Sequence, residues 1–319
     1  MTMLITMFFL SGFALAQSPQ SERIAVIAHR AEHIRNPENS LSGIRAAIKL
    51  GADYVEIDVR TTIDGRLVLM HDATVDRTTN GNGAIAQMTF ERVGMLKLGH
   101  EHVPTFEEAL GIAHGKIGVY VDAKSLTPAA LVHALETHDM GRNVVVYGPP
   151  VFLKSLLSLR PEIKRMPEAV NADTLRTNLT ELRPSVIAFN QQDFLNELIA
   201  AAKSAHTAIF VDRLGDQDNT EAWQDAIQRG ATGIQTDKPG ELVQFLRTRN
   251  LHDAFRWLIG KSPGGDVVLL SASRTDGYHH YIQNLKSRVA SSDLVILDKV
   301  RQAVALFIAG GGQWNYMRH

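Results

Sequence analysis

The chain has 319 residues, of which 45% are hydrophobic and 21% charged, and its formal net charge is −1. This balance is ordinary for a globular protein and gives no indication of a nucleic-acid partner or a polybasic membrane surface. The chain contains no cysteine, which excludes disulfides, thiolate catalysis and cysteine-ligated metals.

The N-terminal segment is a short apolar run, MLITMFFLSGFALAQS, that ends in an A-x-A pattern formed by Ala14 and Ala16. Small residues at these two positions are typical of a signal-peptidase site. The run is shorter than the ~20 apolar residues that span a bilayer, and no Lys or Arg precedes it. We expect residues 1–16 to be a signal peptide cleaved after Ala16. The mature protein would then be periplasmic or secreted, without a stable membrane span.

Eight short apolar and β-branched runs, each bounded by turn residues, predict β-strands. They occupy residues 24–29, 54–59, 118–123, 143–148, 163–166, 186–190, 208–213 and 233–237. Segments with helical periodicity lie between most of them. One of these segments ends at Gly51, a typical C-cap, and another begins with Thr127 and Pro128, a typical helix start. The alternation over residues 23–250 predicts an α/β fold of the (β/α)8 TIM-barrel type.

One additional element interrupts this regular alternation. Asp64-Gly65 lies between two β-type runs and predicts an additional hairpin. The fifth strand, IKRM, is the weakest prediction because it is short and basic.

After the barrel, the Gly- and Pro-containing stretch GKSPGGD predicts a linker over residues 251–265. Residues 266–319 contain further apolar runs but are few for an independent domain.

Carboxylates are spaced on two neighbouring predicted strands in a way that suits a metal site. Active sites of TIM barrels lie at the C-terminal ends of the strands. Glu56 and Asp58 are two residues apart on the second strand, so their side chains point to the same side. Asp122 lies on the third strand. Three carboxylates from adjacent strands can bind a hard divalent cation, Ca²⁺ or Mg²⁺.

Basic and titratable side chains end the same strands. His29 follows the first strand and His71 follows the hairpin arm, so the two imidazoles could act as general base and general acid. Arg30 and Lys124 could bind an anionic substrate. Together with a cation, these groups suit phosphoryl chemistry, because positive charge stabilises the non-bridging oxygens.

The motifs that carry these residues resemble those of the glycerophosphodiester phosphodiesterases over roughly residues 24–248. They are, in order, AHR, PENS, GADYVEIDVRTTIDGRLVLMHDATVDRTTNG, VPTFEEAL, VYVDAK and GIQTDKP. The resemblance implies a TIM barrel that hydrolyses a small-molecule glycerophosphodiester to an alcohol and sn-glycerol 3-phosphate. It also implies that the first attack on phosphorus comes from the 2-hydroxyl of the substrate's own glycerol.

The resemblance assigns a role to each matching residue. It implies that His29 and His71 are the catalytic acid/base pair, and that Arg30 and Lys124 face the phosphate. Glu38 would lie near the site, where it orients Arg30 or touches the metal. The implied metal ligands are Glu56, Asp58 and Asp122.

The chain departs from the family pattern at three places. Ala31 replaces the usual glycine after His-Arg, which should be tolerated unless the backbone needs a positive φ. Asp122 replaces the usual glutamate and could shift the metal or admit a water. The stretch GHEH, before Val103, is short where relatives often carry a longer insertion, which leaves the alcohol moiety of the substrate open.

Several charged residues near these motifs have simpler interpretations. We expect Glu32, His33 and Arg35 to be solvated loop residues, with a substrate contact as the alternative for His33. Asp72 and Arg77 are expected to pin the loop after the hairpin by an ion pair.

The C-terminal residues resemble the start of a cyanophycinase-like serine peptidase domain with an α/β fold. The resemblance rests on GGDVVLLSASRTDGYHHYIQNL and AVALFIAGGGQWNYM within residues 266–319. The family's nucleophilic serine lies beyond this point, so we expect an incomplete segment without peptidase activity.

Alternatives to the leading hypothesis differ in substrate or in class. A related barrel could act on lysophospholipid or sphingomyelin-type substrates, and a non-catalytic protein could bind phosphodiesters. The sequence leaves open the alcohol moiety, the native cation and the oligomeric state.

Overall fold

The structure is a computed structural model that describes residues 23–252. The predicted signal peptide, most of the predicted linker and the cyanophycinase-like segment lie outside these residues. No helix within this range is long and apolar enough to cross a membrane.

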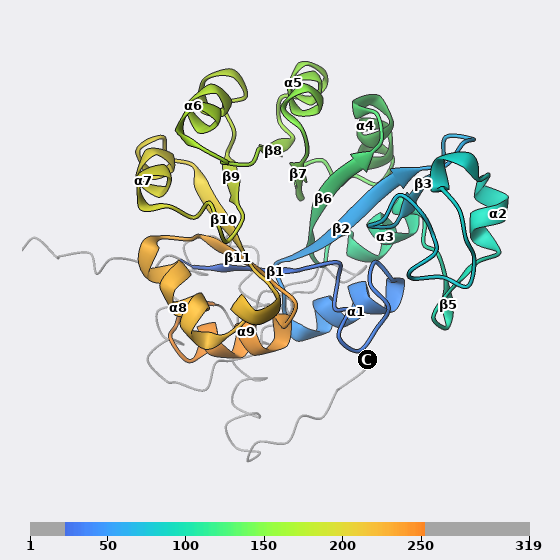
Figure 1. Ribbon diagram of the computed structural model, residues 1–319, viewed down its shortest axis with the longest axis horizontal. Helices are drawn as coiled ribbons and strands as arrows, with labels where there is room; N and C mark the ends of the chain where they lie inside the picture. Colours follow the sequence, from blue (N-terminus) through green and yellow to red (C-terminus); the bar gives the residue numbers. More distant parts are fainter. Residues whose placement is uncertain (1–22, 253–319) are drawn as a thin grey trace, which may run out of the picture.

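The described residues form a parallel β-barrel surrounded by helices (Figure 1). The barrel strands are β1 Ala25–Ala28, β2 Tyr54–Thr61, β6 Gly118–Ser125, β7 Val144–Tyr147, β8 Lys164–Met166, β9 Val186–Phe189, β10 Ala208–Arg213 and β11 Gly233–Thr236. Hydrogen bonding follows the order β8-β7-β6-β2-β1-β11-β10-β9. A parallel bridge between Glu168 and Ala188 joins the two ends and nearly closes the sheet. The predicted TIM barrel is therefore confirmed.

Helices follow the strands and cover the outside of the barrel (Figure 1). They are α1 Leu41–Leu50, α2 Phe90–Gly94, α3 Phe106–Ala113, α4 Pro128–Thr137, α5 Pro150–Leu159, α6 Ala172–Glu181, α7 Asn196–Ser204, α8 Thr220–Arg229 and α9 Pro239–Arg247. The predicted caps are present. Gly51 has a φ of 88° after α1, and the Thr127 hydroxyl accepts a hydrogen bond from the backbone N–H of Ala130 at the start of α4. These caps fix where each helix leaves and re-enters the sheet.

The barrel interior is filled with side chains. Apolar residues of the strands pack inside it, among them Ile27, Val145 and Phe210. Two larger apolar clusters lie between strands and helices, one around β2 and β6 and the other around β10 and β11. The interior is thus a packed core, and the polar side chains gather at the C-terminal ends of the strands, as expected for this architecture.

The fifth barrel strand, β8, forms despite its basic sequence. Arg165 is only 7% exposed, and its guanidinium donates hydrogen bonds to the backbone carbonyls of Pro161, Ile163 and Leu182. A buried guanidinium needs such acceptors, because an unpaired buried charge is costly. The residue that weakened the prediction therefore ties the strand to its flanking loops.

The predicted hairpin pairs β2 with β3 Leu67–Leu69, and Gly65 supplies the left-handed turn with a φ of 82°. The chain beyond β3 continues through the 3₁₀ helix η1 Ile85–Gln87, α2 and a second hairpin, β4 Lys97–Leu98 with β5 Glu101–His102. This excursion has its own apolar core, which includes Val68 and Val93. It carries His71 to the end of the barrel.

Candidate active site

Three carboxylates from the neighbouring strands β2 and β6 lie close together. Asp58 and Asp122 are register partners on these strands, and Glu56 lies two residues before Asp58. Oxygen atoms of the three side chains lie within 4.8 Å of one another. Burial, followed by the charges of Asp58 and Asp122, raises the pKa of Glu56 well above its ordinary value. Two buried carboxylates and the half-buried Asp122 cannot all ionise cheaply side by side, so the donor set fits a hard divalent cation that would neutralise them.

Two further side chains hold this trio in place. Lys124 Nζ donates to Asp122 Oδ2 at 2.6 Å and lies 3.3 Å from Asp58 Oδ1. Asn39 donates from Nδ2 to Asp58 Oδ2 at 2.8 Å, and its Oδ1 accepts the Asp58 backbone N–H at 3.0 Å. This paired contact fixes the Asp58 carboxylate. Asn39 belongs to the PENS motif, but the sequence did not indicate its role.

His29 lies directly after β1 and lines a cavity with the carboxylate trio. Its Nδ1 is 2.7 Å from Asp237 Oδ1. Asp237 follows β11, which pairs with β1 and so brings the two residues together. The hydrogen bond occupies Nδ1 and leaves Nε2 as the ring nitrogen available for proton transfer. Although burial raises the pKa of Asp237, the hydrogen bonds from His29 and the Gly215 N–H outweigh it and lower that pKa.

His71 lines the same cavity and is held in the same way. Its Nδ1 is 2.7 Å from Asp72 Oδ1, and the Arg60 guanidinium donates to its backbone carbonyl at 2.6 Å. The predicted ion pair of Asp72 and Arg77 is present, with Arg77 Nε 2.7 Å from Asp72 Oδ2. Arg77 also binds both oxygens of Glu38, at 2.7 and 2.8 Å. Arg77 therefore clamps the loop after β1 to the loop that carries His71.

Arg30 contacts the site through its backbone and its side chain. Its backbone N–H donates to Glu56 Oε2 at 2.7 Å. Its Nη1 lies 3.3 Å from Glu38, and its buried Nε, 3.9 Å from Asp58, has no hydrogen-bond partner among the described residues. Glu38 lies outside the carboxylate trio. Of the two positions expected for Glu38, the geometry therefore matches the one that orients Arg30.

The backbone here has the conformation that makes Ala31 unusual. Arg30 and Ala31 have φ values of 47° and 67°, in the left-handed region that favours glycine. The Ala31 methyl group is fully buried. The backbone at Ala31 therefore does need a positive φ, which is the condition under which alanine is costly there.

Of two loop residues predicted to be solvated, Glu32 is buried and His33 is only partly exposed, with 21% of its side chain accessible. Glu32 is 5% exposed and accepts a hydrogen bond from Asn36 Nδ2. His33 packs edge-on against His29, with its Nδ1 2.7 Å from the His29 carbonyl oxygen. The prediction was wrong because this loop folds back on α1, where the Glu32 N–H donates to the Gly43 carbonyl. Arg35 is exposed, as predicted.

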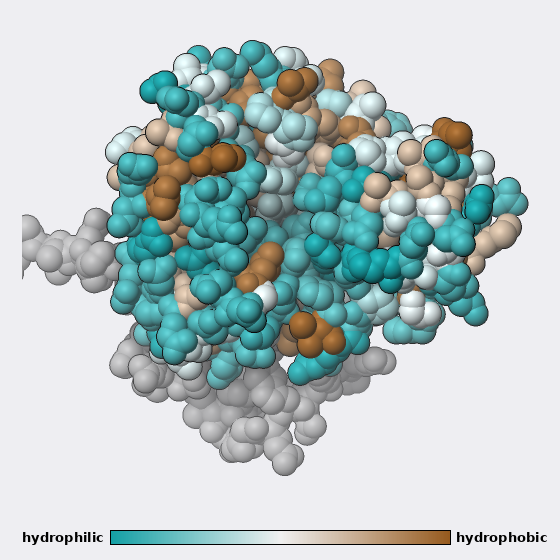
Figure 2. All heavy atoms as spheres, in the orientation of Figure 1, coloured by the Kyte–Doolittle hydropathy of each residue, from teal (hydrophilic) through white to brown (hydrophobic). Residues whose placement is uncertain are grey.

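The site residues line a cavity of about 140 Å³ whose other side was not predicted. We call this side the far wall; it consists of Tyr147, Glu168, Asn190, Asp212 and Gln235. These residues lie at or just beyond the C-terminal ends of β7 to β11. Strand position was therefore the signal that could have found them. The face of the barrel in Figure 2 is largely hydrophilic, with apolar side chains in separate small patches.

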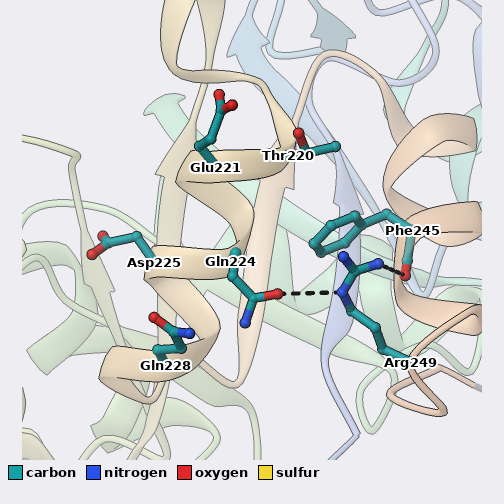
Figure 3. A pocket seen from close by; sticks show the side chains of 7 residues that line it. All are labelled: Thr220, Glu221, Gln224, Asp225, Gln228, Phe245 and Arg249. Carbon is teal, nitrogen blue, oxygen red and sulfur yellow. Dashed lines mark hydrogen bonds between the residues drawn. The ribbon is translucent and has the colours of Figure 1, made fainter.

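A larger hollow of about 340 Å³ lies on the outside of the barrel between α8 and α9 (Figure 3). None of the residues predicted for the site lines it. The Arg249 guanidinium lies 3.7 Å from the Phe245 ring centroid and donates to Gln224 Oε1 at 3.2 Å. Its cationic group is therefore already engaged, and the hollow offers no group for phosphoryl chemistry.

Comparison with known proteins agrees with this geometry. Residues 29–241 match the model of the glycerophosphoryl diester phosphodiesterase family. A glycerophosphodiester phosphodiesterase of Caldanaerobacter subterraneus is 31% identical over 70% of this chain and 97% of its own length. A human relative, glycerophosphodiester phosphodiesterase 1, is 34% identical, and the match covers 44% of each chain. The chain thus matches less than half of this human protein.

Solved structures show the same fold. The glycerophosphodiester phosphodiesterase of Agrobacterium tumefaciens superposes with a TM-score of 0.62 at 27% identity, over 68% of this chain and 98% of the other. A phosphodiesterase of Oleispira antarctica, solved in complex with the product sn-glycerol 3-phosphate, gives a TM-score of 0.65 at 24% identity. That match covers 70% of this chain and 96% of the other.

Proposed function

The chain belongs to the glycerophosphoryl diester phosphodiesterase family, and we propose that it hydrolyses glycerophosphodiesters by metal-assisted catalysis with two histidines. One observation carries the proposal: three carboxylates, two imidazoles that are each hydrogen-bonded to a further carboxylate, and a lysine all line the same cavity. The products would be an alcohol and sn-glycerol 3-phosphate. The relative solved with that product supports this choice.

Each group has one task in the proposed reaction. A divalent cation held by the carboxylate trio would polarise the phosphoryl oxygens. Lys124 and Arg30 add positive charge beside the non-bridging oxygens. One imidazole Nε2 takes the proton of the glycerol 2-hydroxyl, whose oxygen bonds to phosphorus as the P–O bond to the alcohol breaks, and the other imidazole protonates the leaving alcohol oxygen. Water then attacks the resulting cyclic phosphate, the P–O bond to the 2-oxygen breaks and that oxygen is protonated, which gives sn-glycerol 3-phosphate. His29 and His71 each keep a carboxylate on Nδ1, which holds the ring and stabilises it when protonated.

The test is turnover of defined substrates by the purified protein. We expect release of sn-glycerol 3-phosphate from glycerophosphoethanolamine or glycerophosphoglycerol, loss of activity in EDTA, and recovery with added Ca²⁺ or Mg²⁺. His29→Ala should lower kcat by on the order of 10³-fold, because it removes a proton-transfer group. His100→Ala is the matched control, because that side chain is 73% exposed.

Two results would contradict the proposal. Full activity of the His29→Ala variant would exclude the histidine mechanism, and full activity in EDTA would exclude the metal. Lysophospholipid and sphingomyelin in the same assay test the related substrate classes. Binding of glycerophosphodiesters without turnover would identify a binding protein.

A further inference from the structure

The far wall faces the proposed catalytic groups across the cavity and is not explained by phosphate chemistry. It comes from β7 to β11, whereas the carboxylate trio comes from β2 and β6. Glu168 and Asp212 do not belong to the group of carboxylates close enough to share an ion with the trio. The far wall is therefore a separate acidic surface within the same cavity.

Glu168 is fixed in place by neutral donors. The Tyr147 hydroxyl donates to its Oε2 at 3.1 Å, and Asn190 Nδ2 lies 3.3 Å from its Oε1. Asn190 is itself anchored, because its Oδ1 accepts the backbone N–H groups of Gln192 and Asp193. No Lys or Arg within residues 23–252 forms an ion pair with Glu168, so its negative charge faces the cavity without a counter-ion.

Asp212 is a second carboxylate on the same wall, and it is half-buried. Its side chain makes no hydrogen bond or ion pair among the described residues. Arg213 is the nearest cation in sequence, but its guanidinium turns outward to Asp225 Oδ2 and to the Ala222 carbonyl. Burial, followed by the charge of Glu168, raises the pKa of Asp212 to about 7. A positive ligand would remove this penalty, whereas a neutral hydroxyl would leave the charge in place.

Gln235, on the same wall, has a side-chain acceptor that lacks a hydrogen-bond donor among the described residues. It is the register partner of Asp212 on the adjacent strand, it is 7% exposed, and it lines the cavity. Its Oε1 has no hydrogen-bond partner among the described residues. A buried acceptor of this kind is costly unless a ligand donates to it. The far wall is therefore complementary to a group that carries both a positive charge and N–H donors.

We propose that the far wall binds the primary ammonium group of the leaving alcohol, so that the preferred substrates are glycerophosphodiesters of amino alcohols such as ethanolamine. The inference rests on the proposed phosphodiesterase function and adds the class of the alcohol. Asp212 and Gln235 receive N–H donors, and Glu168 supplies the second negative charge. A quaternary ammonium has the charge but no N–H to donate, and a polyol has donors but no charge.

The experiment compares kcat/KM for three substrates that differ only in the alcohol: glycerophosphoethanolamine, glycerophosphocholine and glycerophosphoglycerol. The wild-type chain should prefer the ethanolamine ester over the neutral glycerol ester by at least about tenfold, with the choline ester between them. Asp212→Asn should lower kcat/KM for the ethanolamine ester about tenfold and change that for the glycerol ester less than threefold. Glu168→Gln is the second variant, in case Asp212→Asn fails to fold. Asp173→Asn, the same change on a carboxylate 85% exposed on α6, is the control.

Other outcomes separate this inference from the proposed function. Turnover of the glycerol ester without any preference for the ethanolamine ester would overturn the inference and leave the phosphodiesterase function standing. Equal losses on all three substrates in Asp212→Asn and Glu168→Gln would place the shared glycerol phosphate on the far wall and would also overturn it. Failure of the wild-type chain to turn over any ester would instead overturn the proposed function.

Discussion

At the scale of single residues, the two imidazoles are distinguished by how well their carboxylates are shielded. The His29 and Asp237 side chains are 16% and 19% exposed, whereas those of His71 and Asp72 are 33% and 30% exposed. Electrostatic interactions are stronger where water is excluded. Asp237 should therefore stabilise the protonated form of His29 more than Asp72 stabilises that of His71. Asp72 also shares its charge with Arg77.

Replacement of Asp237 by Asn tests this positioning role. The amide can present an N–H where Asp237 accepts, which would favour the wrong tautomer of His29 and leave Nε2 protonated. We expect kcat to fall by on the order of 10²-fold or more, with little change in KM because Asp237 does not line the substrate cavity. Steady-state kinetics measure kcat and KM separately. Asp216→Asn, at an exposed residue nearby, is the control. A variant with wild-type kcat would show that Asp237 has no part in catalysis.

Ala31 shows two opposing terms at one position. A left-handed φ costs a non-glycine residue about 1–2 kcal/mol, and burial of its methyl group returns about 0.8 kcal/mol. Burial therefore offsets part of the conformational cost, which helps alanine to occupy a position where the family usually has glycine. The turn it supports places the Arg30 N–H on Glu56.

At the scale of elements, the β2–β3 hairpin shows how a turn residue supports a site residue. Gly65 has a φ of 82°, and a Cβ built on it would meet nothing within 4 Å. Any cost of a side chain there is thus conformational and not steric. Gly111 offers the opposite case, because it is exposed within α3, has no positive φ and also has open space around a built Cβ.

The same substitution at these two glycines should have opposite effects. Gly65→Ala should lower the free energy of unfolding by about 1 kcal/mol, because alanine is strained at positive φ. Gly111→Ala should raise it by roughly 0.5–1 kcal/mol, because alanine has the higher helix propensity. Urea denaturation of both variants measures the two changes. Shifts of the same sign would contradict this account of the hairpin turn.

The barrel strands could be predicted from sequence because parallel strands buried on both faces are continuous apolar runs, as in β7 and β9. The carboxylate trio could be predicted because Glu56 and Asp58 are two residues apart on one strand, so their side chains point to the same side. The far wall was missed because Glu168, Asn190 and Asp212 each stand alone at a strand end. Asn190 and Asp212 come together because β9 pairs with β10, and the closing bridge between Glu168 and Ala188 brings Glu168 to the same cavity. The fold-back that buries Glu32 and half-buries His33 depends on tertiary contacts with α1 and likewise had no local signal.

At the scale of the whole molecule, the opposite end of the barrel is held by one buried carboxylate. Asp53, at the start of β2, accepts hydrogen bonds from Arg23, from the Val26 backbone N–H at 2.9 Å and from His252 Nε2 at 3.0 Å. It is 3% exposed. A backbone hydrogen bond from Ile24 to Leu251 runs beside it. Asp53 thus joins the two ends of the described chain beneath the barrel, away from the active site.

Asp53→Asn should destabilise the protein in a pH-dependent way. Burial raises the pKa of Asp53, but the hydrogen bond and charge of His252 and the charge of Arg23 outweigh it and hold the pKa below its ordinary value. The carboxylate therefore stabilises the fold above the unfolded-state pKa of about 3.9, and this contribution is lost as pH falls through the lower folded-state pKa. At pH 7 we expect a loss of about 3 kcal/mol, or a Tm lower by about 6–12 °C. The difference from the wild type should shrink below about pH 4. Thermal melts at several pH values measure it, with Asp173→Asn as the exposed control; a difference independent of pH would rule out the charge of Asp53 as its cause.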